Sequence, residues 1–460
     1  MSILIQHGTL ILPIGPVRCD LRVKGGKILE LGPSLEPGSS QVIDAAGKLV
    51  FPGFIDTHTH FEMNKGLPNE TADDWFTGSR AALAGGTTTV LDFAEPARGA
   101  SLVSALDTWH SRADGISSCN YSFHMTIRDW NPFIRSELPK MTREGITSYK
   151  VYMAYDAIRL SDADIYEALG AIAGEGGITG CHCENGDLVN EGIRAQKAAG
   201  HLGPEAHPLS RPPAVEAEAV NRWLTIAELA DVPVNIVHLS TIRGLEAVRS
   251  ARARGQELYV ETCPQYLLLD ESRYHLPDFQ SAKYVLSPPL RAVGNCDALW
   301  EALRSGDVDT IGTDHCSFHF MPTKQLGKDD FSAIPNGIPG VEHRPALIYT
   351  YGVAAGRITI TDLVRTLSEN PARLFGMWPQ KGCLAVGSDA DIVIFDPNYT
   401  GSITASTQYQ NVDYTPYEGM TLRGRADTVL LNGDVAVEHG EVVLQKKGRF
   451  VRRGPSLLWR

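Results

Sequence analysis

The chain has 460 residues, more than one hydrophobic core usually supports, so we expect at least two domains. Hydrophobic residues make up 43% and charged residues 21%, which is typical of a folded globular protein. The formal net charge of -12 provides no basic excess to meet a phosphate backbone, so we expect no nucleic-acid partner.

The N-terminal residues, MSILIQHGTLILPIGPV, lack a basic segment followed by a long apolar run, so they do not resemble a signal peptide. No stretch of about 18 apolar residues occurs, and we expect no membrane contact. The eight cysteines are scattered without a C-x-x-C pair, which favours reduced thiols. These observations together predict a cytoplasmic location.

The first 50 residues read as short strands separated by turns. Lys24-Gly25-Gly26-Lys27 is typical of a hairpin turn between two of these strands. The tail from about residue 380 has the same character, in runs such as ADIVIFDP and ADTVLLNGDVAVEHGEVVL. Because chain termini often lie close together, the two ends are expected to pair in one small β-domain.

The middle of the chain alternates between short apolar strands and helical stretches. The eight predicted strands cover residues 53–60, 87–96, 121–126, 148–155, 178–185, 234–240, 257–264 and 309–316. Helices are predicted for residues 73–86, 214–230 and 241–255. Eight strand–helix units indicate a (β/α)8 barrel, with a doubly wound open sheet as the alternative.

The first predicted strand ends in two histidines, His58 and His60. Side chains two residues apart in a strand point to the same side, so these imidazoles would converge on one point. Two neutral imidazoles in that arrangement suit a metal ion. The alternative is a pair of ordinary surface or core histidines.

Other polar side chains recur near the same ends of the predicted strands, where the active site of a barrel is expected. The full set is His58, His60, Lys150, His182, His238 and Asp314. Each one alone has a structural explanation, such as a hydrogen-bonded histidine. Their coincidence at equivalent positions favours a metal site.

Lys150 is unusual in this set because it stands among apolar residues in TSYKVYMAY. It could extend its amine to water at a strand edge. Inside a barrel, burial would instead lower the pKa of the amine. A neutral amine can add carbon dioxide and form an anionic carbamate, which is suited to bridging two metal ions.

These motifs resemble a known family. The chain is similar over nearly its whole length to the cyclic amidohydrolases of the amidohydrolase superfamily, specifically the hydantoinase and dihydropyrimidinase group. The motifs run from VIDAAGKLVFPGFIDTHTHF through SYKVYMAY, HCENGD, IVHLS, ETCPQYL, LSPPLR, IGTDHC and PNGIPG to GSDADIVIFDP.

The resemblance implies a (β/α)8 barrel over residues 52–376 and a β-sandwich built from residues 1–51 and 377–460. It implies that two divalent metal ions are bound by the following residues: His58, His60 and Asp314 for one ion, His182 and His238 for the other, and Lys150, as N6-carboxylysine, for both. Zinc is expected, with manganese or cobalt as alternatives. A homotetramer is expected, with a dimer as the alternative.

The activity implied is hydrolytic ring opening of cyclic amides, namely 5-substituted hydantoins and dihydropyrimidines, to N-carbamoyl amino acids. A hydroxide bridging the two metals would attack the ring carbonyl. Asp314 would act as general base and then acid, and Tyr155 would stabilise the oxyanion. Ser287 and Asn336 would hold the ring's amide groups. Barrel packing for Tyr155 and turn positions for Ser287 and Asn336 are the structural alternatives.

The nearest alternative activity is that of an allantoinase or dihydroorotase. No arginine stands out as a clamp for a ring carboxylate, so little activity on dihydroorotate is expected. A non-catalytic dihydropyrimidinase-like scaffold is the more distant alternative, and the complete ligand set argues against it. The loop FEMNKGLPNETADDW (61–75) is more polar than is common in hydantoinases, which leaves the ring substituent open. His124, His315 and His319 are left out of the metal set.

Overall fold

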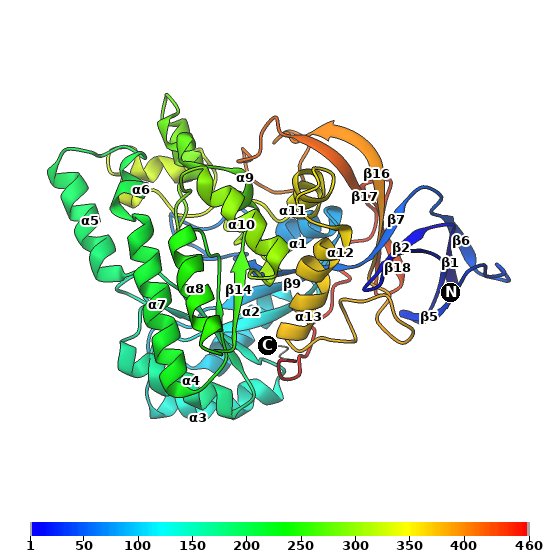
Figure 1. Ribbon diagram of the computed structural model, residues 1–460, viewed down its shortest axis with the longest axis horizontal. Helices are drawn as coiled ribbons and strands as arrows, with labels where there is room; N and C mark the ends of the chain where they lie inside the picture. The colour runs from blue at the N-terminus through cyan, green and yellow to red at the C-terminus, as the bar shows by residue number, and fades with distance from the viewer. Residues whose placement is uncertain (1, 458–460) are drawn as a thin grey trace.

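The computed structural model describes residues 2–457, which form a barrel with a smaller two-sheet domain beside it (Figure 1). The barrel sheet has eight parallel strands in chain order. They are β8 (Phe54–Thr59), β9 (Thr87–Ala94), β10 (Asn120–Thr126), β11 (Ser148–Tyr152), β12 (Ile178–His182), β13 (Val234–Ile236), β14 (Leu258–Thr262) and β15 (Thr310–Ile311). The predicted (β/α)8 barrel is confirmed.

The barrel closes between β8 and the segment that follows β15. Thr59 forms a parallel bridge with His315, and the backbone N–H of His60 donates to the His315 carbonyl at 2.8 Å. The buried Arg344 guanidinium donates to the carbonyls of Ile55 at 2.9 Å and Ile311 at 2.7 Å. Arg344 therefore ties the first barrel strand to the last, which excludes the open sheet.

Helices surround the barrel, and several begin at a residue whose side chain accepts from the first turn. Asp74 caps the first of them in a capping box, and Ser101, Asn131, Ser161 and Asn185 cap later ones. The helices are α1 (Trp75–Ala84), α2 (Leu102–Ala113), α3 (Pro132–Arg143), α4 (Asp162–Gly174), α5 (Gly186–Ala198), α6 (Ala206–Ser210), α7 (Pro213–Ala230), α8 (Ile242–Ala253), α9 (Pro264–Leu268), α10 (Gly294–Ser305), α11 (Arg344–Ile348), α12 (Ile360–Val364) and α13 (Asn370–Leu374). The predicted helices at 73–86, 214–230 and 241–255 correspond to α1, α7 and α8.

Two of the barrel strands are much shorter than predicted. β13 has only three residues and β15 only two. After each strand the chain leaves the ladder, and His238 and Asp314 take positive φ values of 41° and 52°. The functional residues at these two strand ends therefore stand outside the regular sheet.

The second domain is a β-sandwich made from both ends of the chain. One sheet contains β1 (Ser2–Gln6), β4 (Asp20–Lys24), β5 (Lys27–Gly32) and β6 (Gln41–Asp44). The other contains β2 (Thr9–Leu12), β3 (Gly15–Arg18), β7 (Leu49–Pro52), β16 (Ile392–Ser402), β17 (Thr421–Leu431), β18 (Asp434–Glu438) and β19 (Glu441–Val442). Leu10 and Ile394 of this sheet share a hydrophobic core with Ile3 and Leu21 of the first. The hairpin at Lys24–Lys27 is confirmed.

The final described residues leave the sandwich and return to the barrel, beside α13 in Figure 1. The backbone of Tyr121 in β10 exchanges hydrogen bonds with Arg449 and Val451. The buried guanidinium of Arg453 donates to the hydroxyls of Ser122 at 2.9 Å and Ser148 at 2.6 Å. The boundaries drawn at residues 51 and 377 stay a prediction, and this segment packs on the barrel although it lies beyond residue 377.

Among residues 2–457, no helix has the length and apolar character needed to cross a membrane.

Candidate metal centre and active site

A cavity of about 490 Å³ opens at the C-terminal ends of the barrel strands. Its lining includes every side chain singled out from the sequence as a site residue: His58, His60, Lys150, Tyr155, His182, Ser287, His238, Asp314 and Asn336. This is the end of the barrel at which active sites of the fold lie. The structure thus brings all nine candidates together, while their individual roles stay predictions.

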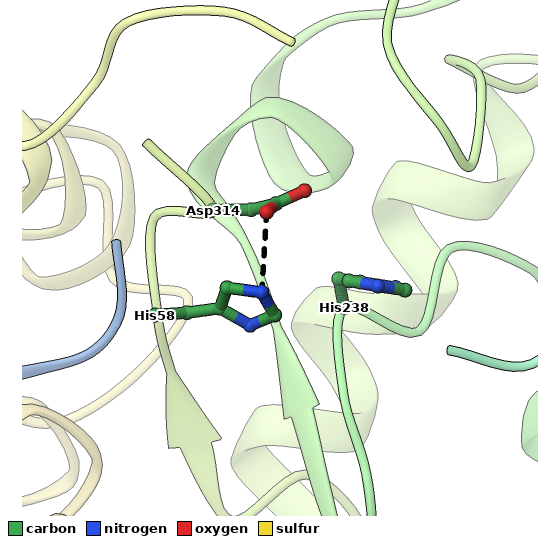
Figure 2. Close-up of side chains that lie close together, drawn as sticks. All are labelled: His58, His238 and Asp314. Carbon is green, nitrogen blue, oxygen red and sulfur yellow. Dashed lines mark ion pairs between the residues drawn. The ribbon is translucent and has the colours of Figure 1, made fainter. Parts of the chain in front are cut away.

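The first group of candidate ligands is formed by His58, His60 and Asp314. Asp314 Oδ1 lies 3.2 Å from His58 Nε2 and 3.3 Å from His60 Nε2. Figure 2 shows the His58 ring facing the Asp314 carboxylate, with His238 beside them. Ligand atoms of His58, His238 and Asp314 all lie within 4.8 Å of one another. The three side chains can therefore contribute to one compact metal centre.

The second group is formed by His182 and His238. Nδ1 of His182 lies 3.0 Å from Nε2 of His238. On its other side, Nε2 of His182 lies 2.8 Å from the Glu184 carboxylate, which also accepts from Arg211 at 2.6 Å. Glu184 therefore holds the proton of His182 on Nε2 and leaves the Nδ1 lone pair facing His238.

Glu261 acts on His58 as Glu184 acts on His182. Its carboxylate lies 2.7 Å from His58 Nδ1 and accepts from the Thr57 hydroxyl at 2.5 Å. Burial and the nearby Lys150 lower the pKa of His58, but Glu261 and Asp314 outweigh them and raise it overall, so the two carboxylates attract positive charge to this ring. A cation held by Nε2 of His58 and the Asp314 oxygen would satisfy the same attraction. Nitrogen and oxygen donors oriented by outer carboxylates fit a divalent metal ion of the zinc, manganese or cobalt type.

Glu184 and Glu261 are acidic residues near the strand ends, but they do not provide a bridge between two metals. Both contact the outer nitrogens of the histidines. Lys150 instead lines the cavity and is 1% exposed, with Nζ 5.0 Å from the centroid of the Phe93 ring. Burial lowers the pKa of its amine, which favours the neutral form that carbamate formation requires.

Three site residues other than glycine have left-handed backbone conformations. The φ values are 68° for Tyr155, 41° for His238 and 52° for Asp314. Such conformations are uncommon outside glycine, most unfavourable for bulky residues, and concentrate at functional sites. The surrounding barrel holds these three side chains in place at the expense of local backbone stability.

Electrostatics in the cavity favour ionised Asp314 and neutral Tyr155. Burial opposes ionisation of Asp314, but the nearby imidazoles of His58 and His60 hold its pKa well below the usual value. Burial raises the pKa of the Tyr155 hydroxyl, although Arg211 opposes this effect. Asp314 can thus accept a proton, while Tyr155 remains a hydrogen-bond donor.

Two buried donors fix the segments that carry Ser287 and Asn336. Lys324, in the 3-10 turn η3 (Thr323–Gly327), donates from Nζ to the carbonyls of Val285, Pro335 and Gly337 at 2.7–2.8 Å. The His207 ring donates from Nε2 to the carbonyl of Leu286 at 2.8 Å. The residues adjoining Ser287 and Asn336 are therefore held by side chains that the sequence analysis did not identify.

Two charged residues that line the cavity, Glu95 and Arg128, were not predicted from the sequence. Glu95 directly follows β9, and Arg128 lies two residues beyond β10. The rule that barrel strand ends carry function would have found both. Arg128 is paired with Glu95 at 2.6 Å, so it is not a free clamp for a ring carboxylate, and the expectation of little activity on dihydroorotate stays a prediction.

The excluded histidines have other partners. His124 contacts the Ser148 hydroxyl at 2.6 Å and the Thr57 carbonyl at 3.0 Å. His315 contacts Asp73 at 3.1 Å and closes the barrel. His319 is half-buried and lies 3.8 Å from a surface aspartate.

Comparisons with known proteins agree with this geometry. Residues 49–436 match the family model described as the amidohydrolase family. A D-hydantoinase of Geobacillus stearothermophilus is 42% identical over 456 residues, which cover 98% of this chain and 97% of that protein. A D-phenylhydantoinase of Escherichia coli strain SE11 is 41% identical, with 99% of each chain covered. The crystal structure of a dihydropyrimidinase from Brevibacillus agri NCHU1002 superposes with a TM-score of 0.97 at 40% identity, covering 99% of both chains.

Proposed function

The chain belongs to the amidohydrolase family, in the group of the hydantoinases and dihydropyrimidinases, and we propose that it opens cyclic amide rings by hydrolysis. The substrates are 5-substituted hydantoins or dihydropyrimidines, and the products are N-carbamoyl amino acids. The observation that carries the proposal is the convergence of four histidines, Lys150 and Asp314 on one cavity in a chain that matches hydantoinases from end to end.

Two divalent metal ions would be held by the histidine and aspartate groups described above, with a carbamylated Lys150 between them. When bound, the ions would polarise the ring carbonyl and lower the pKa of the attacking water. Zinc is the proposed metal, because imidazole and carboxylate ligands suit it, although manganese and cobalt accept the same ligands. Metal analysis of purified protein tests both the number and the identity of the ions.

Asp314 moves the proton in the proposed reaction. The Asp314 carboxylate is the group that would accept the proton of the attacking water. The water oxygen forms a bond to the ring carbonyl carbon, and the bond from that carbon to the ring nitrogen breaks. Asp314 then passes the proton to the departing nitrogen, so the residue ends the cycle as it began.

Tyr155, Ser287 and Asn336 orient the ring. The Tyr155 hydroxyl donates to the carbonyl oxygen as negative charge develops there. Ser287 and Asn336 approach the cavity from segments fixed by Lys324 and His207, and they provide hydrogen-bonding groups for the ring amides. A rigid set of polar groups favours a flat cyclic amide over a flexible linear one.

A substrate panel on purified, metal-analysed protein tests the proposal. It contains dihydrouracil, hydantoin, 5-alkyl and 5-aryl hydantoins, allantoin and dihydroorotate. We expect ring opening of hydantoins or dihydrouracil. Allantoin or dihydroorotate as the best substrate would move the chain to the alternative activity, and the absence of ring opening with bound metal would indicate a scaffold.

We further propose a cytoplasmic homotetramer, with a dimer as the alternative. The eight cysteines are free thiols, which is usual in a reducing compartment. Light scattering after gel filtration gives the oligomeric state, and fractionation of cells gives the location.

A further inference from the structure

One wall of the active-site cavity carries an ion pair that the ring-opening chemistry does not use. Arg128 and Glu95 both line the cavity, and Arg128 Nη2 lies 2.6 Å from Glu95 Oε2. The side chains are 21% and 9% exposed, respectively. The pair is therefore largely removed from bulk water and faces the space that substrate occupies.

Arg128 lies across the barrel from Ser287, whereas Glu95 and Asn336 follow strands that both neighbour β8. Glu95 and Arg128 follow β9 and β10, whereas Ser287 lies in the connection from β14 to β15 and Asn336 follows β15. In the closed eight-strand order, β10 and β14 are four strands apart, so they face each other across the barrel. An exocyclic group that points away from Ser287 would therefore lie toward Arg128 and the Glu95 carboxylate paired with it.

Both members of the pair have hydrogen-bonding capacity left. The Arg128 guanidinium carries five N–H groups, and its hydrogen bond to Glu95 uses one of them, on Nη2. The second Glu95 oxygen lies 3.9 Å from His60 Nδ1, too far for a hydrogen bond. Asn64 and Asn69 add amide groups to the cavity lining. This wall thus presents donors and acceptors side by side.

The Arg128–Glu95 pair should favour some exocyclic substituents of the ring over others. An alkyl or aryl group would cover the pair without replacing its contacts with water, which is unfavourable. A carboxylate attracted by Arg128 would be repelled by Glu95, and an ammonium attracted by Glu95 would be repelled by Arg128. A neutral carboxamide group satisfies both, because its carbonyl accepts from Arg128 and its N–H donates to Glu95.

We propose that the Arg128–Glu95 pair selects cyclic amides whose exocyclic substituent ends in a neutral carboxamide group. This inference rests on the proposed ring-opening function and deepens it. Met63, Ala157 and Ile158 supply apolar contacts for the carbon atoms that link such a group to the ring.

Three hydantoins of nearly equal size test the selection in the wild-type enzyme. They carry carbamoylmethyl, isobutyl or carboxymethyl at the ring carbon, and unsubstituted hydantoin and dihydrouracil serve as references. The carbamoylmethyl compound would form hydrogen bonds to two charged groups. We therefore expect its kcat/KM to exceed that of the isobutyl and carboxymethyl compounds by about 10-fold or more. An equal or higher value for the isobutyl or carboxymethyl compound would overturn the inference.

Variants of Arg128 and Glu95 test how each side chain contributes to the choice of substrate. In Arg128→Met, the ratio of carbamoylmethyl to isobutyl turnover should fall toward one. In Glu95→Gln, the carboxymethyl compound should gain relative to the carbamoylmethyl compound, because the repelling charge is gone. The matched controls come from a second Arg–Glu pair, Arg222 and Glu218 on α7. Their side chains are 3.1 Å apart and do not line the cavity. Arg222→Met and Glu218→Gln should leave both ratios at the wild-type values.

Hydantoin and dihydrouracil distinguish a failure of the selection by Arg128 and Glu95 from a failure of the ring-opening function. If hydantoin and dihydrouracil are opened but the isobutyl compound is preferred, only the selection by Arg128 and Glu95 is wrong. If no ring in the panel is opened by metal-loaded protein, the ring-opening function fails and this inference falls with it.

Discussion

Nδ1 of His182 and Nε2 of His238 lie 3.0 Å apart, and the Glu184 carboxylate occupies the opposite side of the His182 ring. Two ring nitrogens at this separation either share a proton or direct two lone pairs at one cation. Burial lowers the pKa of both imidazoles, which favours their neutral forms. Since Glu184 keeps the His182 proton on Nε2, the pair is preorganised for a metal ion.

Glu184→Gln should therefore weaken metal binding. A glutamine amide can donate as well as accept, so it no longer imposes one tautomer on His182. Loss of such an outer carboxylate typically lowers metal affinity by about 10–100-fold. Chelator competition measures the affinity, and Glu218→Gln on the surface of α7 is the control.

Glu184 also pairs with the buried Arg211, so the variant could lose stability as well as affinity. Glu261→Gln, which acts on His58, provides a second test of the same principle. Unchanged affinity in both folded variants would show that the carboxylates do not tune the metal site.

Asp314→Asn should lower kcat by about 10²–10⁴-fold while leaving a folded protein. The amide cannot take up and return a proton. Asparagine tolerates the positive φ of 52° at this position, so the backbone should be retained. Steady-state kinetics and circular dichroism check the two parts, and a near-normal kcat would remove Asp314 from the proton transfer.

Tyr155→Phe should lower kcat more than it raises KM. The ring packs 5.3 Å from the His182 ring and 5.5 Å from the Arg211 guanidinium carbon, contacts that phenylalanine can preserve. Only the hydroxyl is lost, and removal of one oxyanion donor costs about 10²–10³ in kcat in a comparable case. A change confined to KM would reduce Tyr155 to a binding residue.

His207 should make the stability of the protein depend on pH below neutrality. Burial lowers its pKa to about 3 in the folded protein, whereas the side chain in the unfolded chain has the ordinary histidine pKa of 6.5. As the pH falls below 6.5, the unfolded chain binds a proton that the folded protein excludes, so stability decreases. The loss is about 1.4 kcal/mol per pH unit, or about 2 kcal/mol at pH 5.

His207→Gln keeps a donor for the Leu286 carbonyl but removes this titration. Its melting temperature should fall less between pH 7 and pH 5 than that of the wild type. His275→Gln, at an exposed histidine, is the control and should follow the wild type. Parallel curves for His207→Gln and wild type would contradict the assignment.

The elements of the barrel were readable from sequence because a buried parallel strand needs an apolar, β-branched run, as in TTTVLDFA. The candidate metal ligands could be predicted because polar residues follow or interrupt these apolar runs near the C-terminal ends of the strands. The match to hydantoinases confirms the family resemblance on which the remaining roles were placed.

Contacts between segments that are distant in the sequence could not be predicted. Lys324 meets carbonyls on both sides of Asn336 and near Ser287, and nothing in TKQLG marks it as buried. Glu95 and Arg128 are 33 positions apart and become a pair only when β9 and β10 align. Arg453 reaches the barrel from the end of the chain, in a segment whose sequence gives no sign of leaving the β-sandwich.

Lys150 should be carbamylated and should bridge two metal ions. His58, His60 and Asp314 offer three ligands to one ion, whereas His182 and His238 offer two to the other, so a shared anionic group completes both sets. An ammonium has no lone pair and a neutral amine has one, so unmodified lysine cannot bridge. Glu184 and Glu261 are already engaged with the outer nitrogens of His182 and His58.

Lys150→Ala should therefore lose activity and at least one equivalent of metal. Native mass spectrometry of the wild type should show the added mass of one carbon dioxide, which Lys150→Ala should lack. Metal-free enzyme given zinc should regain activity faster with bicarbonate than without it. If Lys150→Ala kept two tightly bound metal ions and most of its activity, the bridge would have to come from another residue.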